Sequence, residues 1–231
     1  TSSVILNGGN TDLFDREGVK KKAFTGSLKL VTHHWGANWL KGFDIYQRLD
    51  KMLSEKKWSD RVSFTYIGSL PEEFRFTNAT YIAPLSGNDL ATELRRHHIY
   101  LTASRNEPAG MHHIEGALCG LPLFYIESGA LPEYCDGFGI SFTPQNFEQK
   151  LQEMIKNFDH WTKIMPFYPH TADKMCSEYF SLFDNLMENK EKILARRKLF
   201  LKTGFSKKTL YYLKNITKGI KTSAKMILEQ K

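Results

Sequence analysis

Residues 99–119 read IYLTASRNEPAGMHHIEGALC and contain three different local patterns in succession. The apolar run 99–103 predicts a buried strand, and the spacing of apolar residues over 111–119 predicts a short helix. Between them, Asn106, Pro108 and Gly110 favour turns and predict a loop. A strand that leads through a loop into a helix is half of a βαβ unit, so this stretch indicates a parallel sheet.

The same alternation continues on both sides of this stretch. Strands are predicted over 28–33, 62–67, 80–83, 99–103 and 123–126, and helices over 43–53, 88–96, 111–119 and 147–158. This order predicts an α/β fold, a Rossmann-like parallel sheet with helices on both faces that binds ligands at the carboxyl ends of its strands. After Pro166 the pattern becomes helical, with helices predicted over 171–189 and 206–230.

The composition is that of a globular protein, with 41% hydrophobic residues and no apolar run near the roughly 20 residues that a membrane span needs. Its three widely spaced cysteines are typical of a reducing compartment, which favours a cytoplasmic location. The net charge of +7 is uneven, because residues 190–231 hold 13 of the 32 Lys and Arg but only 2 of the 25 Asp and Glu. The remainder is mildly acidic, so nucleic acid is not an expected partner.

Two glutamates, Glu107 and Glu115, stand on either side of the predicted helix start. The first helix amides, at Gly110, Met111 and His112, have no partner within the helix and favour an anion such as phosphate. The carboxylates can accept hydrogen bonds from hydroxyls next to that anion, so the arrangement suits a nucleotide diphosphate sugar. The alternative is that neither glutamate binds a ligand, Glu107 being a solvated loop residue and Glu115 a surface residue of the helix.

The Glu107-x7-Glu115 pair resembles the E-x7-E signature of retaining GT-B glycosyltransferases, most closely those of family 4 of the sequence-based classification. Other segments resemble motifs of that family in the same order, over roughly residues 4–190: NGGNTDLF at 7–14, KGFD at 41–44, GALCGLP at 116–122 and SGALPE at 128–133. The resemblance implies that this chain is the C-terminal, donor-binding half of such an enzyme.

The resemblance also implies residue roles. Glu115 would bind the ribose hydroxyls and Glu107 the hydroxyls of the donor sugar. Lys41 would bind the diphosphate and, together with backbone amides at the helix start, stabilise its developing charge. The donor-binding residues expected from the matched motifs are Gly110, Met111, His112, Ser128 and Gly129. No metal or other cofactor is implied, and the nucleotide diphosphate sugar is the substrate.

The sequence departs from the family where an arginine usually follows the first strand. Residues 32–41 read THHWGANWLK and contain no arginine. His33, His34 or Asn38 could supply the missing donor, although a histidine is only partly protonated at neutral pH. The alternative is that His33 and His34 end a strand and face opposite sides, with one of them buried. The nucleotide base cannot be read, because GSLP at 68–71 replaces the family's usual GDGP.

Three His-His pairs, at 33–34, 97–98 and 112–113, raise the question of a metal site. Adjacent side chains diverge on strands and helices and do not readily chelate one ion. The sequence has no HExxH or Cys/His spacing typical of zinc sites. We therefore expect no metal.

Four segments are expected: an interdomain linker at 1–25 with a short strand at 4–6, the nucleotide-sugar-binding domain at 26–165, a return helix at 166–192 and a basic amphipathic tail at 193–231. An N-terminal acceptor domain would belong to the same or another chain. The tail suits an anionic membrane surface, which favours peripheral binding at the inner face of a membrane and a glycan or lipid-linked acceptor. Alternatively, the tail packs on a protein domain.

The sequence thus predicts a glycosyltransferase that retains anomeric configuration and acts in glycan or cell-envelope polysaccharide synthesis. The alternatives are a non-catalytic nucleotide-sugar-binding module, a partner subunit of a split enzyme, and a nucleotide-sugar epimerase of the same fold.

Overall fold

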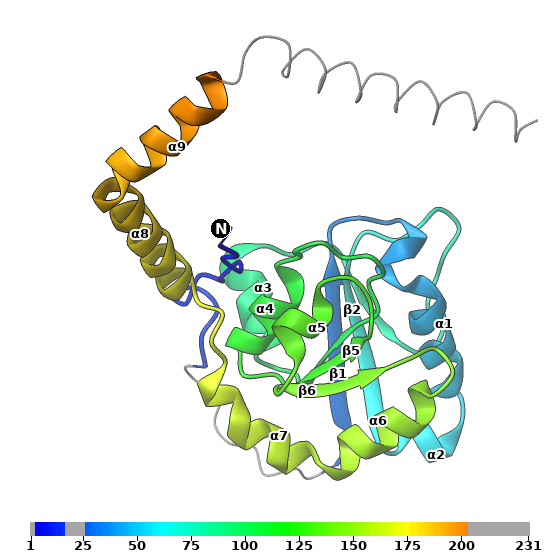
Figure 1. Ribbon diagram of the computed structural model, residues 1–231. Helices are drawn as coiled ribbons and strands as arrows, with labels where there is room; N and C mark the ends of the chain where they lie inside the picture. The colour runs from blue at the N-terminus through cyan, green and yellow to red at the C-terminus, as the bar shows by residue number, and fades with distance from the viewer. Residues whose placement is uncertain (1–2, 17–25, 203–231) are drawn as a thin grey trace, which may run out of the picture. The chain divides into compact units, whose positions relative to one another are not determined.

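The computed structural model describes residues 3–16 and 26–202, and no side chain beyond Arg196 (Figure 1). The chain divides into two compact units between Glu178 and Tyr179, and each is treated by itself. The predicted helix at 206–230, and with it most of the basic tail, lies outside the described residues.

A six-stranded parallel sheet forms the centre of the first unit, and its strands follow the order β3-β2-β1-β4-β5-β6. The strands are β1 (Leu28–His34), β2 (Val62–Gly68), β3 (Thr80–Ile82), β4 (Ile99–Thr102), β5 (Leu123–Ile126) and β6 (Gly139–Phe142). Helices lie on both sides of the sheet (Figure 1). The predicted α/β Rossmann-like fold is therefore confirmed. The strand order reverses between β1 and β4, and in such sheets the ligand crevice lies outside the carboxyl ends of those two strands.

Short helices connect the strands and follow the last one. They are α1 (Phe43–Met52), α2 (Lys56–Ser59), α3 (Gly87–Leu94), α4 (His112–Leu118), α5 (Leu131–Cys135), α6 (Phe147–Lys156) and α7 (Phe158–Ile164), with 3-10 turns η1 (Trp39–Lys41) and η2 (Met165–Phe167). The sequence did not predict α7. The helix predicted over 147–158 corresponds to α6, which ends two residues earlier because Asn157 leaves the helical conformation. Its carbonyl accepts hydrogen bonds from the amides of His160 and Trp161 and so starts α7.

The strand predicted at 4–6 is wrong. Val4 is exposed, and the backbone amide of Asn7 donates to the Tyr134 hydroxyl instead of to a neighbouring strand. The described part of this segment forms a single bridge, between Gly9 and Thr171. The segment predicted as a linker therefore packs along the chain just before α8.

Two helices follow the Rossmann-like region, α8 (Ala172–Glu188) and α9 (Lys190–Lys202). The first agrees with the helix predicted over 171–189, and no residue of α8 is buried. Within residues 3–16 and 26–202, we find no helix that is both long enough and apolar enough to cross a membrane.

The core is built from strands that are covered on both faces. Every residue of β4 and β5 is buried, and β1 and β2 each expose one residue. Such continuous burial is expected of parallel strands between two helical layers. It explains why the uninterrupted apolar runs in the sequence predicted these strands.

A buried carboxylate fixes the last part of the loop between β2 and β3, just before β3 begins. Asp50, on α1, is only 7% exposed. It accepts hydrogen bonds from the backbone amides of Thr77, Asn78 and Ala79 at 2.7–3.2 Å. The side-chain amide of Asn78 donates in return to the Asp50 carbonyl oxygen at 2.9 Å. The loop is therefore attached to α1 by hydrogen bonds to a charged group.

We expect Asp50→Asn to lower the free energy of unfolding by at least about 2 kcal/mol, because hydrogen bonds to a charge contribute about 1.5–3 kcal/mol each. The introduced NH₂ group would also face backbone donors. Chemical denaturation measures the loss. The exposed Asp60→Asn is the control and should have no effect. Equal stability of both variants and the wild type would contradict this role of Asp50.

Candidate functional site

The loops that follow β1 and β4 meet at the point where the strand order reverses. Lys41 Nζ lies 2.7 Å from Glu107 Oε2, and the Ser104 hydroxyl donates to the same oxygen at 2.9 Å. The amide of Arg105 donates to the Leu40 carbonyl at 2.7 Å, which joins the two loops through their backbones. The predicted catalytic residues Lys41 and Glu107 are therefore in direct contact.

Glu107 is 8% exposed, yet its surroundings favour the ionised form. Burial raises the pKa of this carboxyl, but the hydrogen bonds from Lys41 and Ser104 and the charge of Lys41 outweigh burial and hold it below its usual range. Lys41 carries three N–H donors, of which the contact with Glu107 uses one. The side chain of Lys41 is 25% exposed, so a ligand at the sheet edge can reach it.

The loop after β5 holds the backbone of Glu107 in place. Asn106 has a left-handed conformation, with φ of 52°, and its amide donates to the Ser128 hydroxyl at 3.0 Å. The amide of Ala130 donates to the Glu107 carbonyl at 2.8 Å. Gly129 lies against the same backbone. The predicted donor-binding residues Ser128 and Gly129 thus lie beside Glu107.

Gly110 lies between two functional side chains. A Cβ atom at this position would be 2.8 Å from the Glu107 carboxyl carbon and 2.8 Å from the His112 ring. Met111, which is half-buried, comes next, and α4 begins only at His112. Because α4 has seven residues, its dipole is a weak source of positive potential. Lys41 is therefore the main cationic feature of this edge.

Glu115 lies on α4 and contacts the end of β1. Its Oε2 is 2.7 Å from His33 Nε2, and its side chain is 21% exposed. On its other side the His33 ring contacts the hydroxyl of Tyr100, at 3.0 Å from Nδ1. The carboxylate predicted to bind ribose therefore has a fixed partner, which the sequence pattern did not reveal.

His34 and Asn38, the two other candidates for the missing cation, occupy different environments. His34 is buried, and its Nε2 lies 2.8 Å from the Tyr46 hydroxyl. Burial, followed by the charges of His33 and Lys41, lowers its pKa well below 6.5, so the ring is neutral. Asn38 is exposed in the loop after β1, where its carbonyl accepts from the Lys41 amide. The alternative in which only one of His33 and His34 is buried is wrong, since both are buried near the end of β1.

Two more histidines lie beneath the loops. His112 Nε2 is 2.9 Å from the Thr102 hydroxyl, and burial lowers the pKa of His112 well below 6.5. His113 is buried with neither ring nitrogen hydrogen-bonded, and burial lowers its pKa to about 4, against the opposing charge of Glu107. Its ring packs at 5.0 Å from that of His112 and 5.1 Å from that of Tyr134. Burial thus favours the neutral form of His34, His112 and His113. Within the described part of the chain, no three His, Cys, Asp or Glu side chains are grouped as a metal would require.

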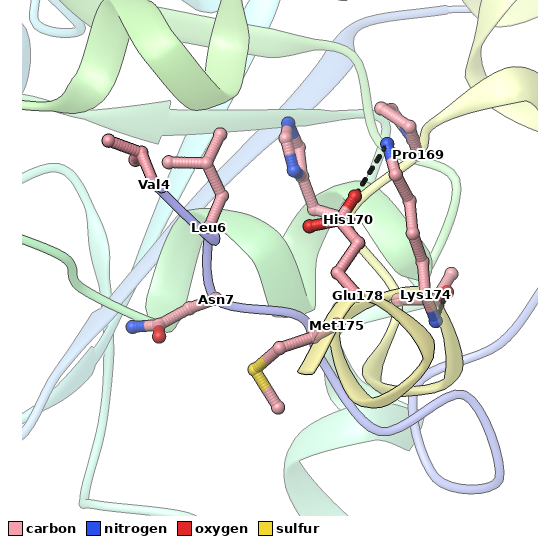
Figure 2. Close-up of a pocket in the computed structure, with 9 residues that line it drawn as sticks. Val4, Leu6, Asn7, Pro169, His170, Lys174, Met175 and Glu178 are labelled. Atoms are coloured by element: carbon pink, nitrogen blue, oxygen red, sulfur yellow. Dashed lines mark hydrogen bonds and ion pairs between the residues drawn. The ribbon is translucent and has the colours of Figure 1, made fainter. Parts of the chain in front are cut away.

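A separate pocket of about 180 Å³ lies where residues 4–7 meet the start of α8 (Figure 2). Val4, Leu6, His170 and Lys174 contribute to its walls, and none of the predicted site residues does. Ligand pockets are typically about 300–1,000 Å³, so this space is too small for a nucleotide sugar. It adjoins the site through Asn7, whose side-chain amide donates to the Ala109 carbonyl at 3.2 Å.

The fold is similar to those of solved glycosyltransferases, although no protein-family model and no curated protein matches the sequence. WaaG, a glycosyltransferase involved in lipopolysaccharide biosynthesis, has a TM-score of 0.59 at 16% identity, over 75% of this chain and 53% of WaaG. A glycosyltransferase from Rickettsia africae has a TM-score of 0.61 at 15% identity, over 81% of this chain and 57% of its own. The C-terminal domain of LpcC, a group 1 family glycosyl transferase from Francisella tularensis, has a TM-score of 0.53 at 18% identity. The match covers 74% of this chain and 98% of the LpcC domain.

At these identities the similarity shows the fold alone, an α/β Rossmann-like fold that matches the C-terminal domains of GT-B enzymes. The chain spans about half the length of the first two structures. The chain covers nearly all of the LpcC C-terminal domain, which was solved by itself.

We expect Gly110→Ala to destabilise the protein by about 1–3 kcal/mol, the usual cost of overpacking. The added methyl group would push the Glu107 carboxylate away from Lys41 or displace the His112 ring. Denaturant titration measures the effect. Gly36→Ala is the matched control, because the nearest atoms would be 3.5 Å and 3.7 Å away, and it should be neutral. If the two variants were equally stable, the close packing at Gly110 would be disproved.

The buried histidines predict acid sensitivity. A histidine whose pKa is lower in the folded than in the unfolded protein binds more protons when the chain unfolds. Its contribution to stability is therefore complete above about pH 6.5, the unfolded pKa. It is lost as pH falls toward the folded pKa. For His113 this window runs from about pH 6.5 to about 4. His113→Phe should therefore reduce the slope of unfolding free energy against pH by about 1.4 kcal/mol per unit near pH 5. The exposed His160→Phe should leave the slope unchanged. An unchanged slope in His113→Phe would show that this imidazole is not held neutral.

Proposed function

We propose that this chain is the donor-binding half of a glycosyltransferase that moves a sugar from a nucleotide diphosphate sugar to an acceptor hydroxyl. Lys41 binds the diphosphate, Glu107 the hydroxyls of the donor sugar and Glu115 the ribose. The observation that carries the proposal is the Lys41–Glu107 contact between the loops that follow β1 and β4, with Glu115 on the adjoining helix.

The geometry suits this division of roles. A lysine that keeps two free N–H donors can hold a phosphate without breaking its contact with Glu107. Glu107 is ionised, so it accepts hydrogen bonds and repels phosphate, which favours sugar hydroxyls beside it. As the glycosidic bond breaks, negative charge grows on the departing diphosphate, and a cation already in place stabilises that charge. The proposal assigns this stabilisation to Lys41, supported by amides near Gly110 and Met111, and includes no metal or other cofactor.

Finer features of the proposal rest on the resemblance of the motifs. They are membership of family 4, retention of anomeric configuration, hexosyl transfer, and an N-terminal acceptor domain in the same or another chain. We further propose a glycan or lipid-linked acceptor in cell-envelope polysaccharide synthesis, at the cytoplasmic face of a membrane. WaaG, which shares the fold, is described as acting in lipopolysaccharide biosynthesis.

A second candidate is a non-catalytic nucleotide-sugar-binding module or partner subunit. The supporting observation is the small number of cations in the loops after β1 and β4. Residues 35–42 and 103–111 contain two basic side chains, Lys41 and Arg105, and Arg105 forms an ion pair with Asp44. A site with one available cation can bind a nucleotide sugar and still be a poor catalyst. Assay of the full-length protein with a panel of donors distinguishes the two functions, because tight binding without turnover of any donor favours the module.

Calorimetry with UDP, GDP and ADP, each with and without an attached sugar, tests the donor site. At least one of these nucleotides should bind. Lys41→Met and Glu115→Ala should each weaken that binding by about tenfold or more, since each removes a charged hydrogen-bonding group. Glu188→Ala, which removes an exposed glutamate of α8, is the control. The proposal would be refuted if neither site substitution changed the nucleotide affinity, or if no nucleotide bound.

A further inference from the structure

The carboxylate of Glu115 is held by a chain of buried groups. Its Oε2 lies 2.7 Å from His33 Nε2, and the His33 side chain is 6% exposed. Among the described residues, Oε1 of Glu115 has no hydrogen-bond partner. One carboxylate oxygen is thus bound by the protein, while the other is available to a ligand.

The Tyr100 hydroxyl determines which nitrogen of His33 carries the proton. The backbone amide of His33, 3.2 Å away, can only donate, so the hydroxyl oxygen accepts there. The single hydroxyl proton then points to Nδ1 of His33 at 3.0 Å, which is closer than the alternative acceptor, the His33 carbonyl, at 3.5 Å. Because burial raises the pKa of Tyr100 well above 10, the hydroxyl keeps that proton at neutral pH. His33 therefore carries its hydrogen on Nε2 and donates it to Glu115.

The support behind His33 is rigid. Tyr100 is fully buried on β4, opposite Val31 of β1. Its ring lies against α4 at Gly116, where a Cβ atom would be 2.2 Å from Tyr100 Cδ2. The same helix carries Glu115 one residue earlier, so the hydroxyl, the imidazole and the carboxylate are fixed by a strand pair and the helix packed on it.

We propose that His33 is a positioning residue that fixes the Glu115 carboxylate through Nε2–H, so that the free carboxylate oxygen meets the ribose hydroxyls of the donor. This inference rests on the proposed function, since it assumes that Glu115 binds ribose. His33 itself does not touch the ligand. Its effect reaches the nucleotide only through the orientation of Glu115, as expected of a group that pre-organises a binding residue.

The test compares the affinity for a nucleoside diphosphate with the affinity for its 2′,3′-dideoxy analogue, using UDP, GDP and ADP on the 231-residue chain. The ratio of the two dissociation constants isolates the ribose hydroxyls. In the wild type we expect a ratio of about 10 to 100, the effect of hydrogen bonds to a charged group. Glu115→Gln should lower the ratio toward 1.

His33→Leu should also lower the ratio toward 1 and leave binding of the dideoxy nucleotide nearly unchanged. His33→Gln should retain most of the ratio, because its amide can donate to Glu115 from a position close to that of Nε2. Tyr100→Phe removes only the hydroxyl and should give an intermediate value. The control is His97→Leu, which removes another buried imidazole, bonded to the Glu93 carbonyl, and should keep the wild-type ratio.

If the role of His33 were purely structural, substitutions of His33 and Tyr100 would reduce thermal stability. Those variants that fold would keep the wild-type ratio. That result would overturn the inference. A ratio near 1 in Glu115→Gln would still support the proposed function. If His33→Leu does not fold, Tyr100→Phe decides, because the inference expects a lowered ratio there and a wild-type ratio would exclude positioning through the Tyr100 hydroxyl. A wild-type ratio near 1 would instead refute the ribose role of Glu115, and the inference would fail with it.

Discussion

The contact between Lys41 and Glu107 is the constraint on which the rest of the site depends. The two residues are 66 positions apart and belong to loops that meet only because the strand order reverses between β1 and β4. A carboxylate that is 8% exposed is costly unless it is paired, and Lys41 and Ser104 supply that pairing. Once Glu107 is fixed, the bond from the Ala130 amide to its carbonyl places the loop after β5 as well. Three loops are thus arranged around one ion pair.

Lys41 also affects the histidines beneath it. Its positive charge acts together with burial to lower the pKa of His34 and of His112. The same ammonium group therefore keeps Glu107 ionised and helps to keep these imidazoles neutral. The result is a layer of side chains that hydrogen-bond without adding charge. The charged side chains of the site are Lys41, Glu107 and Glu115, and the buried His34 and His112 beside them are neutral.

The parts of the fold that the sequence predicted are those with continuous burial or clear periodicity. β1, β2, β4 and β5 are apolar runs covered on both faces, whereas β6 reads Gly-Ile-Ser-Phe at the sheet edge and carries no comparable signal. The five-residue α5 was missed because Leu131–Cys135 contains Pro132 and is too short to show a helical period. The helix α7, which begins directly after Asn157, was not predicted.

For the site, the motifs predicted which residues gather at the sheet edge, but not which atoms pair. The bond between His33 and Glu115 joins residues 82 positions apart and depends on the register that sets Val31 opposite Tyr100. A shift of one residue would turn His33 to the other face of the sheet, and no local pattern in the sequence fixes that register. The same is true of Asp50, whose partners lie 27 to 29 positions away in a loop without periodicity.

The absence of an arginine after the first strand has a physical explanation in this arrangement. The end of β1 is buried between β2 and β4, and its two histidines are each 4% exposed. Among the described residues the His34 side chain bonds to the Thr32 and Tyr46 hydroxyls and to no anion, so an always-charged guanidinium would be costly at position 34, whereas the His34 imidazole is neutral. His33 therefore contributes orientation of Glu115, and the neutral His34 contributes a bond to Tyr46. In the proposed donor complex the diphosphate would meet Lys41 without the family's usual arginine, so hydrogen bonds to ribose and sugar would supply more of the binding free energy.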